Sequence, residues 1–92
     1  MKRIVVLGAG ESGTGAAILA KAKGMEVFVS DMGEIAPMYQ ALLDQHHIAW
    51  ESGKHTPELI LNADEVIKSP GIPLTAPLVK QLIAQGTPIL SE

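Results

Sequence analysis

The fold is decided by the stretch Val5-Val6-Leu7-Gly8-Ala9-Gly10-Glu11-Ser12-Gly13. An apolar run leads directly into three glycines at the spacing Gly-x-Gly-x-x-Gly, and an apolar-periodic segment then continues to Lys23 before Gly24 ends it. This succession predicts a buried strand over residues 3–8, a tight turn, and a helix from about Ser12 to Lys23. The same order of elements is typical of phosphate-binding βα turns.

Each glycine of this turn has an expected role. Gly8 allows the chain to turn sharply, Gly10 leaves room for a ligand phosphate, and Gly13 lets the helix pack against the strand. The amides of Glu11, Ser12 and Gly13 are expected to bind a diphosphate, with the positive end of the helix dipole behind them. A tight turn without a ligand is the alternative interpretation. The turn is not a Walker loop, because no lysine followed by serine or threonine comes after its last glycine.

The rest of the chain alternates between strand and helix signals. Further strands are predicted at residues 26–30, 48–50, 65–68 and 88–91, and further helices at about 37–46, 57–62 and 75–86. This alternation indicates an α/β domain: a Rossmann-like five-stranded parallel sheet with helices on both faces. In the first helix, Ala16, Leu19 and Ala20 are expected to face the core, and Gly15 is expected at a close helix–sheet contact. Thr56 has the position of a helix N-cap.

The composition restricts the class and the partners of the chain. Its 92 residues suit one domain, and a hydrophobic content of 47% with only 3% aromatic residues predicts an aliphatic core. A net charge of −3 without a basic block argues against nucleic acid as a partner. The absence of cysteine excludes disulfides and thiol chemistry and is compatible with the cytoplasm. We expect no membrane association, because no stretch approaches the ~20 apolar residues of a membrane helix, and no secretion signal, because the first apolar run lacks a cleavage pattern.

Two further features follow predicted strands and so join the glycine turn at one edge of the sheet. Asp31 ends the second strand, where an acid accepts hydrogen bonds from ribose hydroxyls in dinucleotide folds; the alternative is an aspartate that orders its own loop. Ser69-Pro70-Gly71-Ile72-Pro73 follows the fourth strand and predicts a rigid turn. In it, Gly71 is expected to take a positive φ and to expose amides to an anion, unless the segment is an ordinary turn. Ligands of such folds bind at this carboxyl edge.

The remaining polar residues do not form a recognisable catalytic or metal site. His46 and His47 are neighbours that do not converge on a helix, and His55 has no second ligand at metal-binding spacing, so no metal is expected. Lys68, at the end of the fourth strand, could face the ligand edge, but it is expected to be solvated, as lysines at strand ends usually are. No catalytic residue is assigned.

Three segments together resemble the N-terminal UDP-binding domain of the Mur ligases of peptidoglycan synthesis. They are the glycine-rich turn, Ser30-Asp31, and Lys68-Ser69-Pro70-Gly71-Ile72-Pro73. The Ser-Pro-Gly-Ile segment is most similar to the branch that adds D-glutamate to UDP-N-acetylmuramoyl-L-alanine. The resemblance covers nearly the whole chain. It implies that residues 1–92 form a single UDP-substrate-binding domain, the N-terminal fragment of a longer multidomain ligase.

The resemblance also implies which residues hold the UDP part of the substrate. The backbone of Glu11 and Ser12 contacts the diphosphate, Asp31 contacts the uridine, and the turn after the fourth strand lines the nucleotide pocket. Relatives often have a hydroxyl residue and then arginine after the aspartate, whereas Met32 and Gly33 follow it here. The full implied set is Gly10, Glu11, Ser12, Gly13, Asp31, Met32, Ser69, Pro70, Gly71 and Ile72.

For the full-length protein the resemblance implies a cytoplasmic, ATP- and Mg-dependent ligase. It acts in cell wall biogenesis, and hence in cell shape, cell division and the cell cycle. ATP phosphorylates the substrate carboxylate, and the amine of D-glutamate then attacks the acyl phosphate. The ATP and metal sites belong to later domains, so the present chain is expected to hold no cofactor and to be inactive alone. Two other interpretations remain open: an NAD-binding domain of a dehydrogenase or regulatory protein, and a structural domain with a vestigial nucleotide fold.

Overall fold

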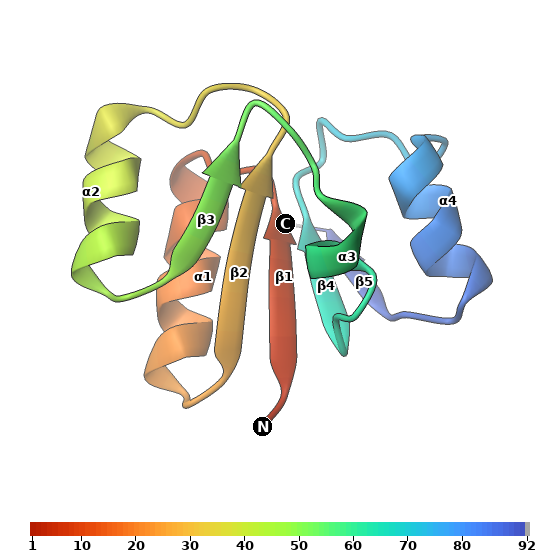
Figure 1. Ribbon diagram of the computed structural model, residues 1–92, viewed down its shortest axis with the longest axis horizontal. Coiled ribbons are helices and arrows are strands. Elements are labelled where there is room, and N and C mark those ends of the chain that lie inside the picture. Colours follow the sequence, from red (N-terminus) through yellow and green to blue (C-terminus); the bar gives the residue numbers. More distant parts are fainter. Residues whose placement is uncertain (92) are drawn as a thin grey trace.

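The computed structural model describes residues 1–91, within which five strands and four helices alternate (Figure 1). All strand pairings are parallel, and the strand order is β3-β2-β1-β4-β5. The predicted α/β class and five-stranded parallel sheet are confirmed. In chain order the elements are β1 Arg3–Leu7, α1 Glu11–Ala22, β2 Glu26–Asp31, α2 Pro37–Gln45, β3 Ala49–Ser52, α3 Pro57–Ile60, β4 Glu65–Lys68, α4 Pro77–Ala84 and β5 Ile89–Ser91.

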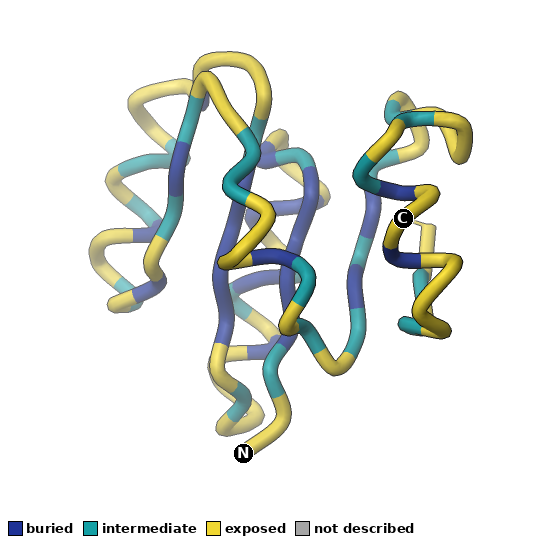
Figure 2. Tube along the Cα trace, turned by 45° about the vertical axis from the view of Figure 1, so that its right-hand side comes forward, coloured by how far each residue is buried: buried dark blue, intermediate teal, exposed yellow. Residues whose placement is uncertain are grey.

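Helices cover both faces of the sheet, with α1 and α2 on one face and α3 and α4 on the other (Figure 1). The two central strands are buried along most of their length (Figure 2). Their side chains alternate between two cores: Ile4 and Val6 join the core beneath α1 and α2, whereas Val5 and Leu7 join the core beneath α3 and α4. Burial on both faces accounts for the continuous apolar run at the start of the sequence. None of the helices described is long and apolar enough to cross a membrane.

The strand order reverses direction between β1 and β4. From β1 the chain proceeds through β2 to β3, and then crosses to the other side of β1 to form β4. The turns that leave β1 and β4 therefore lead to helices on opposite faces of the sheet. Folds of this kind bind ligands in the crevice between two such turns.

Several local predictions were wrong. Gly15 is exposed, and Leu19 is 58% exposed, because the buried face of α1 is made by Gly13, Thr14, Ala17 and Ala20. The third strand extends to Ser52 and so includes Glu51, which lies beyond the strand predicted over residues 48–50. Thr56 stands at the N-cap position of α3, but its hydroxyl does not cap the helix, because it donates to Glu51 instead.

Candidate functional site

The turns after β1 and β4 are in direct contact at the carboxyl edge of the sheet. Gly8 has a φ of +100°, and a Cβ built on it would lie 2.7 Å from the Cβ of Ser69. The amide of Gly8 donates to the carbonyl oxygen of Ser30 at 2.9 Å, and the amide of Ser69 donates to that of Leu7 at 2.9 Å. The glycine at position 8 is therefore needed for two reasons, its backbone conformation and the absence of a side chain.

The first turn of α1 presents unpaired amides at this edge. Gly10 is the N-cap residue and offers no side chain to cap the helix, and its carbonyl oxygen accepts from the amide of Thr14 at 2.9 Å. Within residues 1–91, the amides of Glu11, Ser12 and Gly13 have no hydrogen-bond acceptor. A Cβ built on Gly10 would meet no atom within 4 Å, so the space beside these amides is open. Such amides, at the positive end of a helix dipole, are suited to an anion.

Asp31 connects two loops of the edge. Its Oδ2 accepts from the amide of Ala9 at 2.8 Å, and its Oδ1 accepts from the amide of Gly33 at 2.9 Å. The carboxylate thus ties the β1–α1 turn to the loop after β2, which is the loop-ordering role considered for it from the sequence. Each carboxylate oxygen has a further lone pair, so contact with a ligand hydroxyl remains compatible with this role.

Lys68 organises the turn after β4. Its side chain is only 4% exposed, and its Nζ donates to the carbonyl oxygens of Ile72 at 2.7 Å and of Ser69 at 3.1 Å. The prediction that Lys68 is solvated was therefore wrong. The turn folds back over Lys68, so the buried ammonium group of this lysine holds the carbonyl groups of the turn in place.

The prediction that Gly71 takes a positive φ was also wrong. Gly71 does not have a left-handed backbone, and its amide lies 3.4 Å from the Oγ of Ser69 rather than pointing freely outward. A Cβ built on it would be 3.8 Å from that oxygen, which is an ordinary contact. The flanking prolines and Lys68 define the turn, so it does not depend on the conformational freedom of glycine.

Sequence reasoning missed a buried polar network beside the edge. Ser30 and Glu51 are register partners on neighbouring strands, and the Ser30 hydroxyl lies 2.8 Å from the Oε2 of Glu51 and 2.7 Å from the Nδ1 of His55. Glu51 also accepts from the amide of Thr56 at 2.8 Å and from its hydroxyl at 2.6 Å. The one signal in the sequence was a serine that directly follows the apolar run of residues 27–29 within one strand.

The network keeps Glu51 ionised. Burial by itself raises the pKa of this carboxyl, but the hydrogen bonds from Thr56 and Ser30, with the charge of Lys54, outweigh burial and leave the pKa below its usual value. Ser30 is fully buried, so the serine–histidine–glutamate group has no access to a substrate as a nucleophile. The network is a structural support for the loop that carries His55.

A cavity of about 330 Å³ opens next to this network, on the face of the sheet covered by α3 and α4. Its walls are largely apolar, and Met32 of the loop after β2 lines it together with residues at the start of α4. The lining residues are Met32, His55, Pro57, Ala76, Pro77, Leu78 and Gln81. Its volume lies at the lower end of the range for small-molecule sites, and its lining is apolar with few polar groups, as in such sites.

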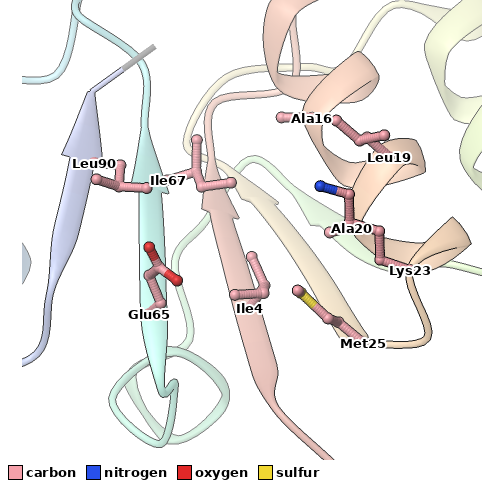
Figure 3. A pocket seen from close by; sticks show the side chains of 9 residues that line it. All are labelled: Ile4, Ala16, Leu19, Ala20, Lys23, Met25, Glu65, Ile67 and Leu90. Carbon is pink, nitrogen blue, oxygen red and sulfur yellow. The ribbon is translucent and has the colours of Figure 1, made fainter.

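A second groove, of about 240 Å³, lies away from the carboxyl edge, between α1 and strands β1, β4 and β5 (Figure 3). It is mainly apolar and includes the exposed side chains of Leu19 and Leu90, with Lys23 and Glu65 as its charged members. None of the site residues predicted from the sequence lines this groove.

The described residues do not fit an ATP–magnesium site. Thr14 and Gly15 follow the last glycine of the turn, where a phosphate loop of the Walker type has lysine and then serine or threonine. Within residues 1–91 there is also no group of three histidine, aspartate or glutamate side chains arranged to hold a metal ion.

Comparison with known proteins places these observations in a family. Residues 2–91 match the family model described as Mur ligase MurD-like, N-terminal domain. All 92 residues align at 73% identity with a UDP-N-acetylmuramoylalanine–D-glutamate ligase of Bacteroides thetaiotaomicron, and 97% of the chain aligns at 60% identity with the ligase of that name from Porphyromonas gingivalis. The chain spans 21% and 20% of the length of these two relatives.

Solved structures agree with this placement. A UDP-N-acetylmuramate:L-alanyl-gamma-D-glutamyl-meso-diaminopimelate ligase from Neisseria meningitides matches with a TM-score of 0.81 at 26% identity, over 99% of this chain and 28% of that chain. The nucleotide-binding domain of glutamyl-tRNA reductase from Thermoplasma volcanium matches with a TM-score of 0.63 at 15% identity, over 98% of this chain and 74% of that chain. The second match shows a shared fold alone.

Proposed function

Because this chain belongs to the MurD-like N-terminal domain family of the Mur ligases, we propose that its carboxyl edge binds the UDP part of UDP-N-acetylmuramoyl-L-alanine. The curated relatives are named as ligases that join UDP-N-acetylmuramoylalanine and D-glutamate. The chain matches about a fifth of their length, and its proposed task is to anchor one end of that substrate.

The observation that best supports this proposal is the row of open amides at the start of α1. The diphosphate would accept hydrogen bonds from the amides of residues 11–13, beside the space left by Gly10. The ribose would then meet Asp31, the next polar group along the edge, and the turn of residues 69–72 would border the nucleotide. The buried ammonium group of Lys68 adds positive charge beneath that turn.

For the whole protein we propose a cytoplasmic, ATP-dependent ligase of peptidoglycan synthesis that forms an amide bond to D-glutamate. Because the described residues do not fit ATP and magnesium, both would be held by other domains. The present domain would fix the UDP end, so that the distant carboxylate of the substrate reaches those domains in one orientation. The isolated chain is then expected to bind the substrate without turning over ATP.

An NAD-binding domain is the competing function. Both ligands offer a diphosphate to α1, so the glycine turn does not discriminate between them. The β4–α4 turn lies directly against the β1–α1 turn, with Ser69 in contact range of Gly8. The second half of a dinucleotide would need this part of the switch point, and the contact therefore favours a mononucleotide with a sugar attached.

Calorimetric titration of the chain with UDP-N-acetylmuramoyl-L-alanine and with NAD tests the proposal. Gly10→Ala adds a methyl group that meets nothing in the free protein but would meet the diphosphate, so we expect an intact fold and substrate affinity lowered by about tenfold. Gly15→Ala is the matched control, because Gly15 is exposed on α1 and its Cβ position is also open. Tighter binding of NAD, or equal substrate affinity in Gly10→Ala and the parent chain, would refute the proposed function.

A further inference from the structure

The hydrogen-bond network around Ser30 determines where its hydroxyl proton points. The Oε1 of Glu51 accepts from the Thr56 hydroxyl, and its Oε2 accepts from the Thr56 amide and lies 2.8 Å from the Ser30 Oγ. An ionised carboxylate has no proton to donate, so Ser30 must supply the hydrogen in its contact with Glu51. A serine hydroxyl has only one hydrogen, which the Oε2 of Glu51 accepts at 2.8 Å in preference to the carbonyl oxygen of Lys54 at 3.2 Å.

The direction of the Ser30 hydroxyl hydrogen also fixes the tautomer of His55. Its Nδ1 lies 2.7 Å from the Ser30 Oγ, which can only accept there, because its hydrogen already points to Glu51. If Nδ1 carried no proton, its lone pair would face a lone pair of the Ser30 Oγ at 2.7 Å, which is repulsive. Neutral His55 therefore has its proton on Nδ1, which leaves Nε2 as a hydrogen-bond acceptor. Within residues 1–91, Nε2 has no hydrogen-bond partner.

His55 lines the cavity of about 330 Å³, and Met32, the residue after Asp31, lines the same cavity. Met32 and Pro77 belong to the apolar walls of that cavity, and Gln81 is the other polar side chain that lines it. If the diphosphate lies at α1 and the ribose at Asp31, the next part of the nucleotide to enter this cavity is the base. The side-chain amide of Gln81 can either donate or accept a hydrogen bond. His55 is therefore the lining side chain whose role, that of acceptor, is fixed.

We infer that His55 selects uracil over cytosine by accepting a hydrogen bond from the base N3–H at its Nε2. Uracil has a hydrogen on N3 at neutral pH, whereas cytosine has a lone pair there that would oppose the lone pair of Nε2. The inference rests on the proposed function, which supplies a nucleoside diphosphate at the carboxyl edge, and it adds a residue that reads the base. Ser30 and Glu51 act as positioning residues that hold the tautomer.

UDP and CDP are the appropriate probes, because they differ only in the base. We expect the chain at about pH 8 to bind UDP about three- to tenfold more tightly than CDP, as one hydrogen bond gained or opposed would produce. His55→Gln, with an amide that donates or accepts equally well, should reduce this ratio to about one. His46→Gln is the matched control, because His46 lies at the C-terminal end of α2 and should keep the ratio.

Nitrogen NMR of the histidine rings supplies a readout that a purely structural role would not move. We expect His55 to show a protonated Nδ1 and a bare Nε2 in the free chain, and the Nε2 signal to shift with UDP more than with CDP. A proton on Nε2 in the free chain, or equal affinity for UDP and CDP while the amides of residues 11–13 still respond, would overturn the inference alone. If neither nucleotide moves those amides, the proposed function fails together with it.

Discussion

Gly8 and Ser69 approach so closely at the carboxyl edge that the Cβ of an alanine at position 8 would lie 2.7 Å from the Cβ of Ser69. The backbone φ of Gly8 is +100°, which is also unfavourable for a residue with a side chain. We therefore expect Gly8→Ala to lower the free energy of unfolding by about 2 kcal/mol or more, from strain and overlap combined. Urea denaturation of the two chains measures this difference.

Gly71→Ala is the matched control for this first prediction. Its Cβ would meet only the Ser69 Oγ, at 3.8 Å, and its φ is not left-handed. We expect its unfolding free energy to differ from that of the parent chain by less than about 0.5 kcal/mol. Equal stability of the Gly8 and Gly71 variants would show that the two turns do not meet as described.

Lys68→Met tests whether the buried cation shapes the turn after β4. The substitution removes two hydrogen bonds from Nζ to the carbonyl groups of Ser69 and Ile72, while methionine keeps the apolar part of the side chain in place. We expect faster amide hydrogen exchange at Ser69, Gly71 and Ile72 and weaker nucleotide binding. Lys80→Met, at an exposed position of α4, should leave both unchanged; unaltered exchange in Lys68→Met would contradict the assignment.

Glu51 predicts a specific dependence of stability on pH. Because its pKa in the folded chain is lowered below the ordinary value of about 4.3, ionised Glu51 stabilises the fold above that value. This contribution is lost as the pH falls from about 4.3 through the folded pKa. Urea denaturation at a series of pH values, compared between the parent chain and Glu51→Gln, should show a stability difference that is largest near neutral pH and shrinks on acidification.

The expected size of that difference at neutral pH is about 1–3 kcal/mol, because glutamine cannot accept at both terminal atoms and leaves donors of Thr56 or Ser30 unpaired. Glu58→Gln, an exposed position in α3, serves as the control and should change little. A Glu51→Gln difference that is constant with pH would mean that the carboxylate charge is not what stabilises the network.

Asp31→Asn tests whether the carboxylate of Asp31 orders the two loops of the edge. The asparagine can accept from Ala9 or from Gly33, but not from both, so one backbone amide loses its partner. We expect a cost of about 1–2 kcal/mol in unfolding free energy, together with weaker UDP binding, measured by denaturation and by titration. Full stability in this variant would argue that the two hydrogen bonds do not order the edge.

Hydrophobic periodicity, together with glycine and proline at the ends of elements, was enough to predict the order of strands and helices. Continuous apolar runs bounded by glycine or proline marked the strands, and these signals are local. The family was also recognisable from three short segments, and residues 2–91 match the model of that family. The meeting of the glycine turn, Asp31 and the β4–α4 turn followed from the geometry of parallel sheets, in which strand ends share an edge.

The errors concern contacts and backbone conformations that hydrophobic periodicity does not report. The burial of Lys68 depends on the turn that folds over its ammonium group, and no local pattern reports that. The role of Glu51 depends on its pairing beside Ser30, which was concealed because the predicted third strand ended at residue 50, two residues before its observed end at Ser52. Gly71 was assigned a positive φ on composition alone, whereas the positive φ that the site needs is at Gly8.

The most direct test of the central claim is an amide-resolved NMR titration of the chain with UDP-N-acetylmuramoyl-L-alanine. If the carboxyl edge binds the UDP part, saturable shifts should be concentrated at residues 11–13, 31–33 and 69–72, with His55 responding alongside them. Leu19 and Leu90, in the groove between α1 and β5, should not respond. Shifts centred on that groove, or none at saturating ligand, would contradict the account.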